Sequence, residues 1–219
     1  MNHQVLGDVS PENFKCLIEY LKVPLPVNEY RLKSGIGRSQ CFGVVKQRNG
    51  HYHGSRMNHY RPEVYRELQK ISKLLPEGFT FDGIQLNQNY QTAPHKDVGN
   101  RGNSIIIGFG DYQGGHLLIE ETSVDIKNKL VAFDGSIYTH STAPYTGDRY
   151  SIVFFSVKRH FKIKPEYEVI DYDKKLYLKE KMYGVERWYG KNGDCIWATD
   201  GIVPQKRAGQ PILDRCEEF

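Results

Sequence analysis

Two histidines and one aspartate in this sequence have the residue types and the spacing of a metal site. His95 and Asp97 stand two positions apart, at a turn after a strand-like run that ends in LNQNY. Residues i and i+2 of an extended chain point to the same side, so both side chains can reach one ion. His140, in YTHSTAP, is the candidate third ligand. Two histidines and a carboxylate form the facial triad that binds non-haem iron(II) and leaves coordination positions open.

An arginine and a serine follow, nine and eleven residues after His140, where the apolar strand IVFF begins. On a strand, Arg149 and Ser151 share one face with Val153 and Phe155. An inward arginine at that place is costly unless an anion meets it. A dicarboxylate cosubstrate would satisfy this arginine, with one carboxylate held by the guanidinium and by the serine hydroxyl.

The elements that must position these residues are mostly short strands. Between residues 79 and 164, short apolar runs are separated by Gly, Asn and Asp at a spacing of about ten residues, which is typical of an all-β sandwich or barrel. Helical periodicity predicts helices over 10–21, where Ser10 can cap, and over 61–75. We therefore expect an α+β, mainly β fold. One domain would span 1–164, with a basic N-terminal region over 1–78 and a β core over 79–164, and residues 165–219 would form an appendage packed on that core.

The combination of His-x-Asp, a later His and Arg-x-Ser in a β-rich domain resembles the Fe(II)/2-oxoglutarate-dependent dioxygenase superfamily. The resemblance implies a double-stranded β-helix, or jelly-roll. It also implies oxidative decarboxylation of 2-oxoglutarate coupled to hydroxylation of a C–H bond. Fe(II), 2-oxoglutarate and O2 are then the expected cofactors, with ascorbate as a candidate reductant. His95, Asp97 and His140 would be the catalytic metal ligands.

A narrower resemblance, over residues 85–156, is to the TET/JBP branch, whose members oxidise the 5-methyl group of pyrimidines in nucleic acid. An Asn or Asp three residues after the metal-binding Asp contacts the base in that family, and Asn100 stands there. His116, in GGHLLI, matches a residue at the C1-carboxylate side of 2-oxoglutarate, and Arg38, in GIGRSQCFG, is the candidate to complete the cosubstrate pocket. Turn geometry among glycines is the alternative for Asn100, and a core position is the alternative for His116.

The distribution of charge points to a possible polyanionic partner. The chain has 30 Lys and Arg against 26 Asp and Glu, a net charge of +4. Residues 30–75 contain ten Lys and Arg against two acids, a local charge of +8, with His and Tyr interleaved. This mixture suits a phosphate backbone and unstacked bases, and a solvated basic face is the alternative. We expect nucleic acid, and DNA in particular, as the partner, with Lys46, Arg48 and Arg56 as contacts.

Composition excludes several other classes. With 39% hydrophobic and 12% aromatic residues the chain can form a sizeable core, which excludes disorder for most of it. No apolar run approaches the roughly 20 residues that cross a bilayer, and the N-terminal residues do not resemble a secretory signal. The four cysteines contain no CxxC pair, so neither a zinc module nor the Cys-rich region of animal TET proteins is expected. An intracellular protein of the nucleus or cytoplasm follows, not secreted, with no membrane and no obligate protein partner.

The leading hypothesis is therefore oxidation of 5-methylcytosine in DNA, and other substrates stay open. The same iron chemistry could act on thymine, on RNA or on a protein side chain, although Arg149 disfavours a prolyl hydroxylase, which commonly uses Lys there. A non-catalytic nucleic-acid-binding module with a degenerate iron site is the second alternative. We expect Asn87 and Asn89 on one face of the strand before His95, where a hydrogen bond to cosubstrate or to a metal-bound water and a structural role in the sheet are equally compatible with them.

Overall fold

The computed structural model describes residues 2–31, 33–46, 52–157, 166–172, 175–182, 185–189 and 195–198. The chain divides into two compact units. The first comprises Met1–Gly43 with Arg56–Lys158, and the second comprises Val44–Ser55 with Arg159–Phe219. His95, Asp97 and His140 all belong to the first unit. The domain boundary expected after residue 164 stays a prediction.

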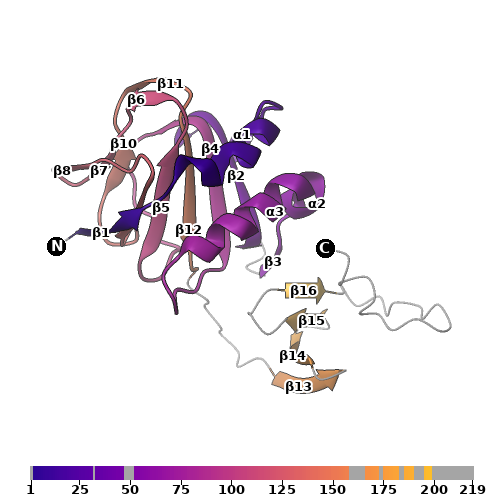
Figure 1. Ribbon diagram of the computed structural model, residues 1–219. Coiled ribbons are helices and arrows are strands. Elements are labelled where there is room, and N and C mark those ends of the chain that lie inside the picture. Colours follow the sequence, from indigo (N-terminus) through magenta and orange to yellow (C-terminus); the bar gives the residue numbers. More distant parts are fainter. Residues whose placement is uncertain are drawn as a thin grey trace. The chain divides into compact units, whose positions relative to one another are not determined.

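Short antiparallel strands build the first unit (Figure 1). They are β1 (His3–Asp8), β2 (Gly35–Lys46), β4 (Gly83–Thr92), β5 (Ser104–Phe109), β6 (Tyr112–Gly114), β7 (Leu117–Ile119), β8 (Thr122–Val124), β9 (Lys129–Phe133), β10 (His140–Thr142), β11 (Tyr145–Gly147) and β12 (Tyr150–Phe155). The large sheet has the order β1-β9-β5-β12-β4-β2-β3, in which β3 (Tyr52–Gly54) pairs with the end of β2 that belongs to the second unit. Two smaller sheets have the orders β10-β7-β8 and β11-β6.

Strand alternation gives the large sheet two different faces. On β12, which lies between β4 and β5, Ile152 and Phe154 point into the main hydrophobic core. The intervening Ser151, Val153 and Phe155 point to the opposite face, where they line a pocket. On that side β5, β7, β8 and β9 contribute to a second apolar cluster. A sheet packed on both faces in this antiparallel arrangement confirms the predicted mainly β jelly-roll.

Helices cover the face that carries the main core, as α1 and α3 show in Figure 1. The helical segments are η1 (Pro11–Phe14), α1 (Lys15–Leu21), η2 (Glu29–Arg31), α2 (Arg56–Tyr60), α3 (Pro62–Ile71) and η3 (Ser72–Leu74). Ser10 caps the first as predicted, because its Oγ accepts a hydrogen bond from the backbone N–H of Glu12 at 3.4 Å. The helices predicted over 10–21 and 61–75 are thus confirmed. No described helix has the length and apolar character to cross a membrane.

The hydrophobic pattern did not predict β1 or α2. β1, with the sequence HQVLGD, pairs along its length with β9, more than a hundred residues further on. Its Val5 is exposed at the sheet edge, so the strand lacks the apolar alternation by which a local pattern would identify it. Its pairing partner is what makes it a strand.

The second unit contains a separate antiparallel sheet of order β13-β14-β15-β16. Its strands are β13 (Glu166–Tyr172), β14 (Lys175–Met182), β15 (Val185–Tyr189) and β16 (Cys195–Ala198). Residues 199–219 lie outside the described part of the chain.

Candidate metal centre and its pocket

Backbone pairing brings the two candidate histidine ligands together. His95 follows β4 and His140 begins β10, and the N–H of each donates to the carbonyl of the other, at 3.0 and 2.9 Å. Asp97 is held at the same place because its N–H donates to the Gly135 carbonyl at 2.8 Å. Ligand atoms of His95, Asp97 and His140 all lie within 4.8 Å of one another. The three residues predicted as metal ligands are therefore one cluster that could hold an ion.

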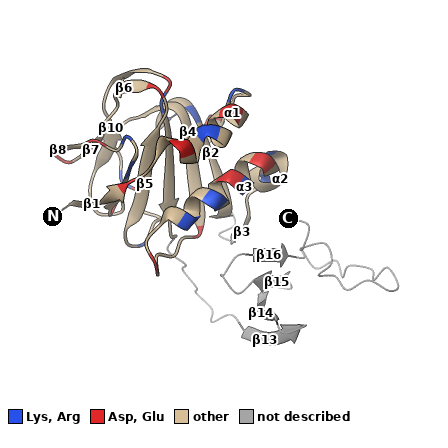
Figure 2. Ribbon diagram, viewed as in Figure 1, with Lys and Arg blue, Asp and Glu red and all other residues tan. Residues whose placement is uncertain are grey.

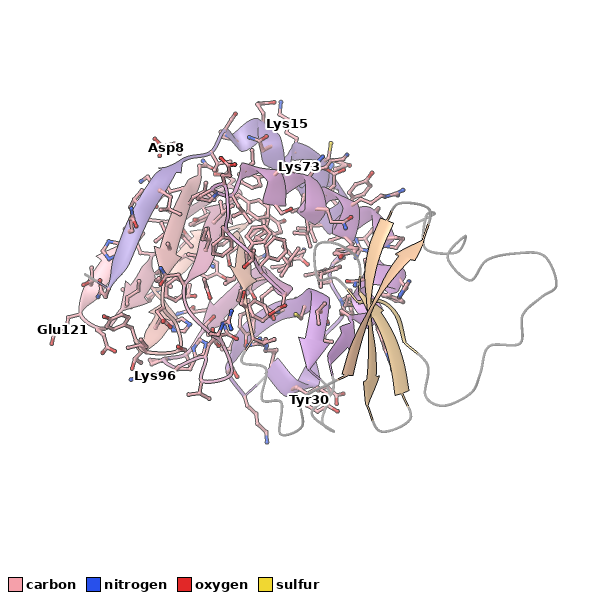
Figure 3. The ribbon with its side chains drawn as sticks, turned by 90° about the horizontal axis from the view of Figure 1, so that it is seen from below. Asp8, Lys15, Tyr30, Lys73, Lys96 and Glu121 are labelled. Atoms are coloured by element: carbon pink, nitrogen blue, oxygen red, sulfur yellow. The ribbon has the colours of Figure 1, made fainter. Side chains whose placement is uncertain are left out.

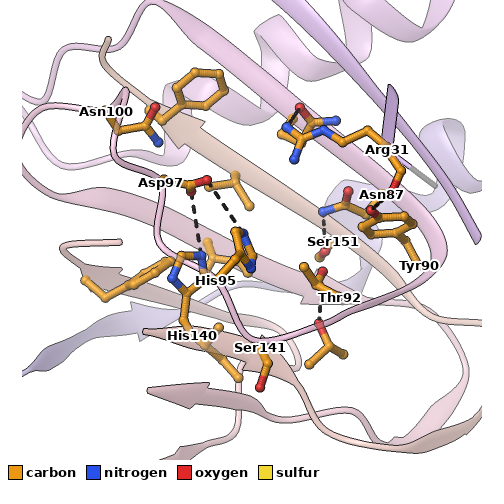
Figure 4. Close-up of a pocket in the computed structure, with 17 residues that line it drawn as sticks. Arg31, Asn87, Tyr90, Thr92, His95, Asp97, Asn100, His140, Ser141 and Ser151 are labelled. Atoms are coloured by element: carbon orange, nitrogen blue, oxygen red, sulfur yellow. Dashed lines mark hydrogen bonds and ion pairs between the residues drawn. The ribbon is translucent and has the colours of Figure 1, made fainter. Parts of the chain in front are cut away.

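Hydrogen bonds to backbone carbonyls orient both imidazole rings. Nδ1 of His95 lies 2.9 Å from the Ala93 carbonyl, and Nδ1 of His140 lies 3.2 Å from the Tyr138 carbonyl. A carbonyl only accepts, so each Nδ1 must carry the hydrogen and each neutral ring keeps a lone pair on Nε2. Both Nε2 atoms face the Asp97 carboxylate, each 3.6 Å from one of its oxygens (Figure 4). Fixing of the tautomer by a second hydrogen bond is typical of metal-binding histidines.

The cluster also perturbs its own protonation. Burial alone would raise the pKa of Asp97, but the hydrogen bonds and charges of His140 and His95 outweigh burial and hold that pKa well below its usual range. Asp97 in turn raises the pKa of His95, against the opposing effect of burial. The carboxylate is therefore ionised at neutral pH, as a metal ligand must be.

A pocket opens beside the cluster on the inner face of the large sheet (Figure 4). Its polar wall comes from η2, β4, β10, β12 and the loop after β4, and its apolar wall comes from Ile106, Leu117, Phe133, Val153 and Phe155. The remaining lining residues are Arg31, Gln85, Asn87, Tyr90, Thr92, His95, Asp97, Asn100, His140, Ser141, Thr142 and Ser151. The candidate ligands therefore face a space in which a small molecule can approach them.

Arg149 is fully enclosed and has no acidic partner among the described residues. Its side chain is 2% exposed, and its Nε donates to the Gly115 carbonyl at 3.0 Å. Its guanidinium carbon lies 5.6 Å from the ring centroids of both Tyr112 and Tyr145. Burial lowers the pKa of Arg149, which is the expected effect of a buried cation that no carboxylate offsets. The structure places Ser151 in the pocket wall and Arg149 beside it, outside the residues that line the pocket.

The structure separates the other predicted site residues into two groups. Asn100 lines the pocket, and its N–H also donates to the Asp97 carbonyl at 2.8 Å, so it has both the turn role and the pocket position. His116 does not line the pocket, and its Nδ1 lies 3.0 Å from Ser123 Oγ. Arg38 does not line it either, and its guanidinium donates to the Leu25 carbonyl at 2.6 Å.

Most of the described Lys and Arg residues of the basic segment 30–75 do not line this pocket. Buried Arg61 donates to the carbonyls of Tyr20 and Val23, and exposed Lys70 pairs with Glu67 of the same helix at 2.7 Å. Helix α3 carries both basic and acidic residues (Figure 2), the acids being Glu63 and Glu67. Figure 3 shows Lys15 and Lys73 on the helical side and Lys96, between two candidate ligands, on the opposite side.

Of the three basic residues singled out as DNA contacts, only Arg56 has a described side chain, and it does not line the pocket. Arg56 begins α2 and is exposed. The Lys46 side chain and Arg48 lie outside the described residues. Among the described Lys and Arg residues of the basic segment, Arg31 is the one that lines the pocket.

Sequence reasoning missed Arg31, Tyr90 and Gln85 as pocket residues. Asn87 and Asn89 do not share a face as expected, because Asn89 has a φ of 48° that turns it out of the alternation. Asn87 lines the pocket, whereas Oδ1 of Asn89 accepts from the Arg149 N–H at 2.8 Å. Alternation along β4 from Asn87 would have identified Gln85, but nothing local in the sequence marks Arg31.

Comparisons with known proteins extend the fold assignment. No protein-family model and no curated protein matches the sequence. A solved structure of NgTET1 in complex with 5mC DNA aligns with a TM-score of 0.54 at 14% identity, over 72% of each chain. An oxidoreductase of the 2OG-Fe(II) oxygenase family from Burkholderia pseudomallei aligns at 15% identity over 73% of this chain and 85% of that one, with a TM-score of 0.46. A Pseudomonas putida prolyl-4-hydroxylase aligns at 14% identity over 72% and 93%, with a TM-score of 0.43. At this identity the likeness to NgTET1 shows a shared fold.

Proposed function

We propose that this protein is an Fe(II)- and 2-oxoglutarate-dependent dioxygenase that oxidises the 5-methyl group of a pyrimidine in DNA, with 5-methylcytosine as the base. The observation that carries the proposal is the cluster of His95, Asp97 and His140 at an accessible pocket of a jelly-roll. Two imidazole nitrogens and one carboxylate oxygen suit iron(II), and they leave coordination positions for other ligands.

Features of the Arg149 region fit a bound dicarboxylate. The buried guanidinium of Arg149 lacks a carboxylate partner among the described residues, and the buried hydroxyl of Tyr112 lacks a hydrogen-bond partner among them. Gly115 makes room for this arginine, because a Cβ at that position would lie 2.7 Å from the Arg149 side chain. A buried cation beside an unused hydroxyl is the environment that a carboxylate satisfies. These residues and Ser151 would hold the distal carboxylate of 2-oxoglutarate.

The chain's own residues then have distinct roles. His95 and His140 would bind the metal through Nε2, and Asp97 would bind it through its carboxylate. When bound, the metal supplies the site at which 2-oxoglutarate and O2 react. Apolar side chains of the pocket wall, such as Phe133 and Leu117, exclude water from this site, which strengthens each polar interaction inside it.

Two observations support a nucleic-acid base as the substrate. Asn100 lines the pocket three residues after Asp97, and its amide can both donate to and accept from the polar edge of a base. The NgTET1 structure that shares this fold is a complex with 5mC DNA. Enzymes that act on a base in duplex DNA turn it out of the stack into such a pocket.

Product analysis tests this proposal directly. Duplex DNA containing 5-methylcytosine is incubated with the protein, Fe(II), 2-oxoglutarate and ascorbate, and the digested nucleosides are measured by mass spectrometry together with succinate. We expect the amounts of oxidised 5-methylcytosine and of succinate to rise together, and we expect neither product with His140→Ala. If the oxidised product is thymine or an RNA base, or if succinate is released only with a protein substrate, that molecule is the substrate and 5-methylcytosine is not. Absence of succinate with every substrate would contradict the proposed chemistry.

A further inference from the structure

Four hydrogen bonds join Arg31 to Ser151 across three strands of the pocket wall. Arg31 Nη2 donates to Gln85 Oε1 at 2.9 Å, and Gln85 Nε2 donates to Ser39 Oγ at 2.7 Å. Ser39 Oγ donates to Asn87 Oδ1 at 2.6 Å, and Asn87 Nδ2 donates to Ser151 Oγ at 3.1 Å. Figure 4 shows Arg31 and the last of these links. We call these five residues the relay.

The relay brings together residues that strand pairing aligns. Ser39 of β2 and Ser151 of β12 both stand opposite Asn87 of β4 in the sheet register, so the three form one row across the sheet. Gln85 lies one alternation earlier on β4, on the same face. Ser39, Gln85, Asn87 and Ser151 are all buried, whereas Arg31, from η2, is only half-buried.

The guanidinium at one end sets the direction of the first two links. Arginine has donors and no acceptor, so the Gln85 atom that faces it must be the amide oxygen, and the Gln85 amide nitrogen then donates to Ser39. The Ser39 hydroxyl hydrogen in turn has Oδ1 of Asn87 as its acceptor, and Asn87 presents its NH2 group to Ser151, whose oxygen accepts. A reversed Asn87 amide would face Ser39 with its NH2 group and leave the buried Ser39 hydrogen without an acceptor in the relay.

After the last link, the hydroxyl hydrogen of Ser151 has no acceptor among the residues that the structure describes. The side chain is 2% exposed and lines the pocket. Because its oxygen already accepts from Asn87, its hydrogen points away from the relay. A buried hydroxyl hydrogen needs an acceptor, so a ligand at this wall must present one, and a carboxylate oxygen does so most strongly.

We propose that Arg31 is a positioning residue that, through Gln85, Ser39 and Asn87, holds the Ser151 hydroxyl as a hydrogen-bond donor toward the pocket and so makes this wall selective for a carboxylate. The inference rests on the proposed function, because the carboxylate is that of the cosubstrate 2-oxoglutarate. It assigns Arg31 a role at a distance from the ligand.

Direct attraction between Arg31 and the ligand is the competing explanation, and a double-mutant cycle separates the two. If Arg31 acts through Ser151, removal of the serine hydroxyl removes the effect of Arg31 as well. If Arg31 acts by its charge, its effect persists when the hydroxyl is absent. Arg31→Lys keeps a donor for Gln85, and Lys33→Gln removes a charge from an exposed neighbour that does not line the pocket.

The experiment measures the Kd of 2-oxoglutarate for the Mn(II)-loaded protein by calorimetry, without turnover. We expect Arg31→Leu and Ser151→Ala each to raise the Kd about 10-fold, which is the size of one hydrogen bond to a charged group. The double variant should bind as Ser151→Ala does. Arg31→Lys and Lys33→Gln should bind within about 2-fold of the wild type. Gln85→Met breaks the relay at its second residue. It must therefore raise the Kd of 2-oxoglutarate as Arg31→Leu does, and have no further effect when combined with Ser151→Ala.

The outcomes separate the relay from the proposed function. A double variant about 100-fold weaker than the wild type, the product of the two single effects, would overturn the relay and leave 2-oxoglutarate binding intact. Gln85→Met that binds as the wild type would also overturn it. A wild-type protein that binds no 2-oxoglutarate would overturn the proposed function, and the relay proposal with it. Thermal unfolding of each variant verifies that it is folded.

Discussion

His95 and His140 are a directly paired couple, each donating its backbone N–H to the carbonyl of the other at 3.0 and 2.9 Å, although 45 positions separate them in the chain. Their rings lie with centroids 4.3 Å apart. The placement of the candidate ligands is therefore anchored by the main chain, which adds rigidity that side-chain contacts alone would not supply.

Removal of one ligand should abolish metal binding. We expect His140→Ala to lower the affinity for Mn(II) or Co(II) by more than about 100-fold, because changes outside the ligand set already cost 10–100-fold. Metal titration followed by calorimetry or by the Co(II) absorption spectrum measures this change. His59→Ala, which removes an exposed histidine from α2, is the matched control and should bind as the wild type. Equal affinity in the two variants would exclude His140 as a ligand.

Metal affinity should fall as the pH is lowered. Asp97 raises the pKa of His95, so in the metal-free protein this ring keeps its proton to a higher pH than an ordinary histidine. The metal must displace that proton below the raised pKa, and the affinity should then lose about tenfold per pH unit from this group. The lowered pKa of Asp97 means that the carboxylate contributes no proton near neutrality. Calorimetry in two buffers of different ionisation enthalpy measures the protons released, which should increase from pH 8 to pH 6.

A methyl group at Gly115 should weaken cosubstrate binding. Gly115 has a φ of +65°, and a Cβ there would lie 2.7 Å from Cδ and Nε of Arg149. Gly115→Ala should therefore displace the guanidinium and raise the Kd of 2-oxoglutarate by about 10-fold or more. Gly78→Ala is the matched control, because Gly78 has a similar φ of +80° but no atom within 4 Å of the added Cβ. Both variants carry backbone strain, so a loss of affinity shared by both would indicate strain and not displacement of Arg149.

Charge reversal can establish which part of the basic segment contacts DNA. If Lys46, Arg48 and Arg56 meet phosphates, their joint replacement by Glu should weaken DNA binding and flatten its dependence on salt, by about 0.9 in log–log slope per lost contact. Reversal of Lys70 and Lys73 tests the helical side, which lies opposite Lys96. We expect that second variant to keep the wild-type slope. An unchanged slope in the first variant would remove these three residues from the interface.

Much of the fold follows from local pattern. The helices over 10–21 and 61–75 carry their own periodicity, and alternation on β12 correctly placed Ser151, Val153 and Phe155 on one face. These are properties of a few consecutive residues, because backbone sterics fix the period of a strand or a helix. A single left-handed residue defeats such reasoning, as Asn89 does, since its φ of 48° is not encoded in the alternation.

By itself, then, the sequence determined which residues can bind a metal, that they sit in a β-rich domain, and which strand face carries Ser151. Only the tertiary structure decided that His95 pairs with His140, and that Arg31 reaches the pocket while Arg38 bonds to the Leu25 carbonyl. The physical reason is that contacts between distant segments depend on how the whole chain closes on itself. Residue types and spacing record only the preferences of neighbours along the chain.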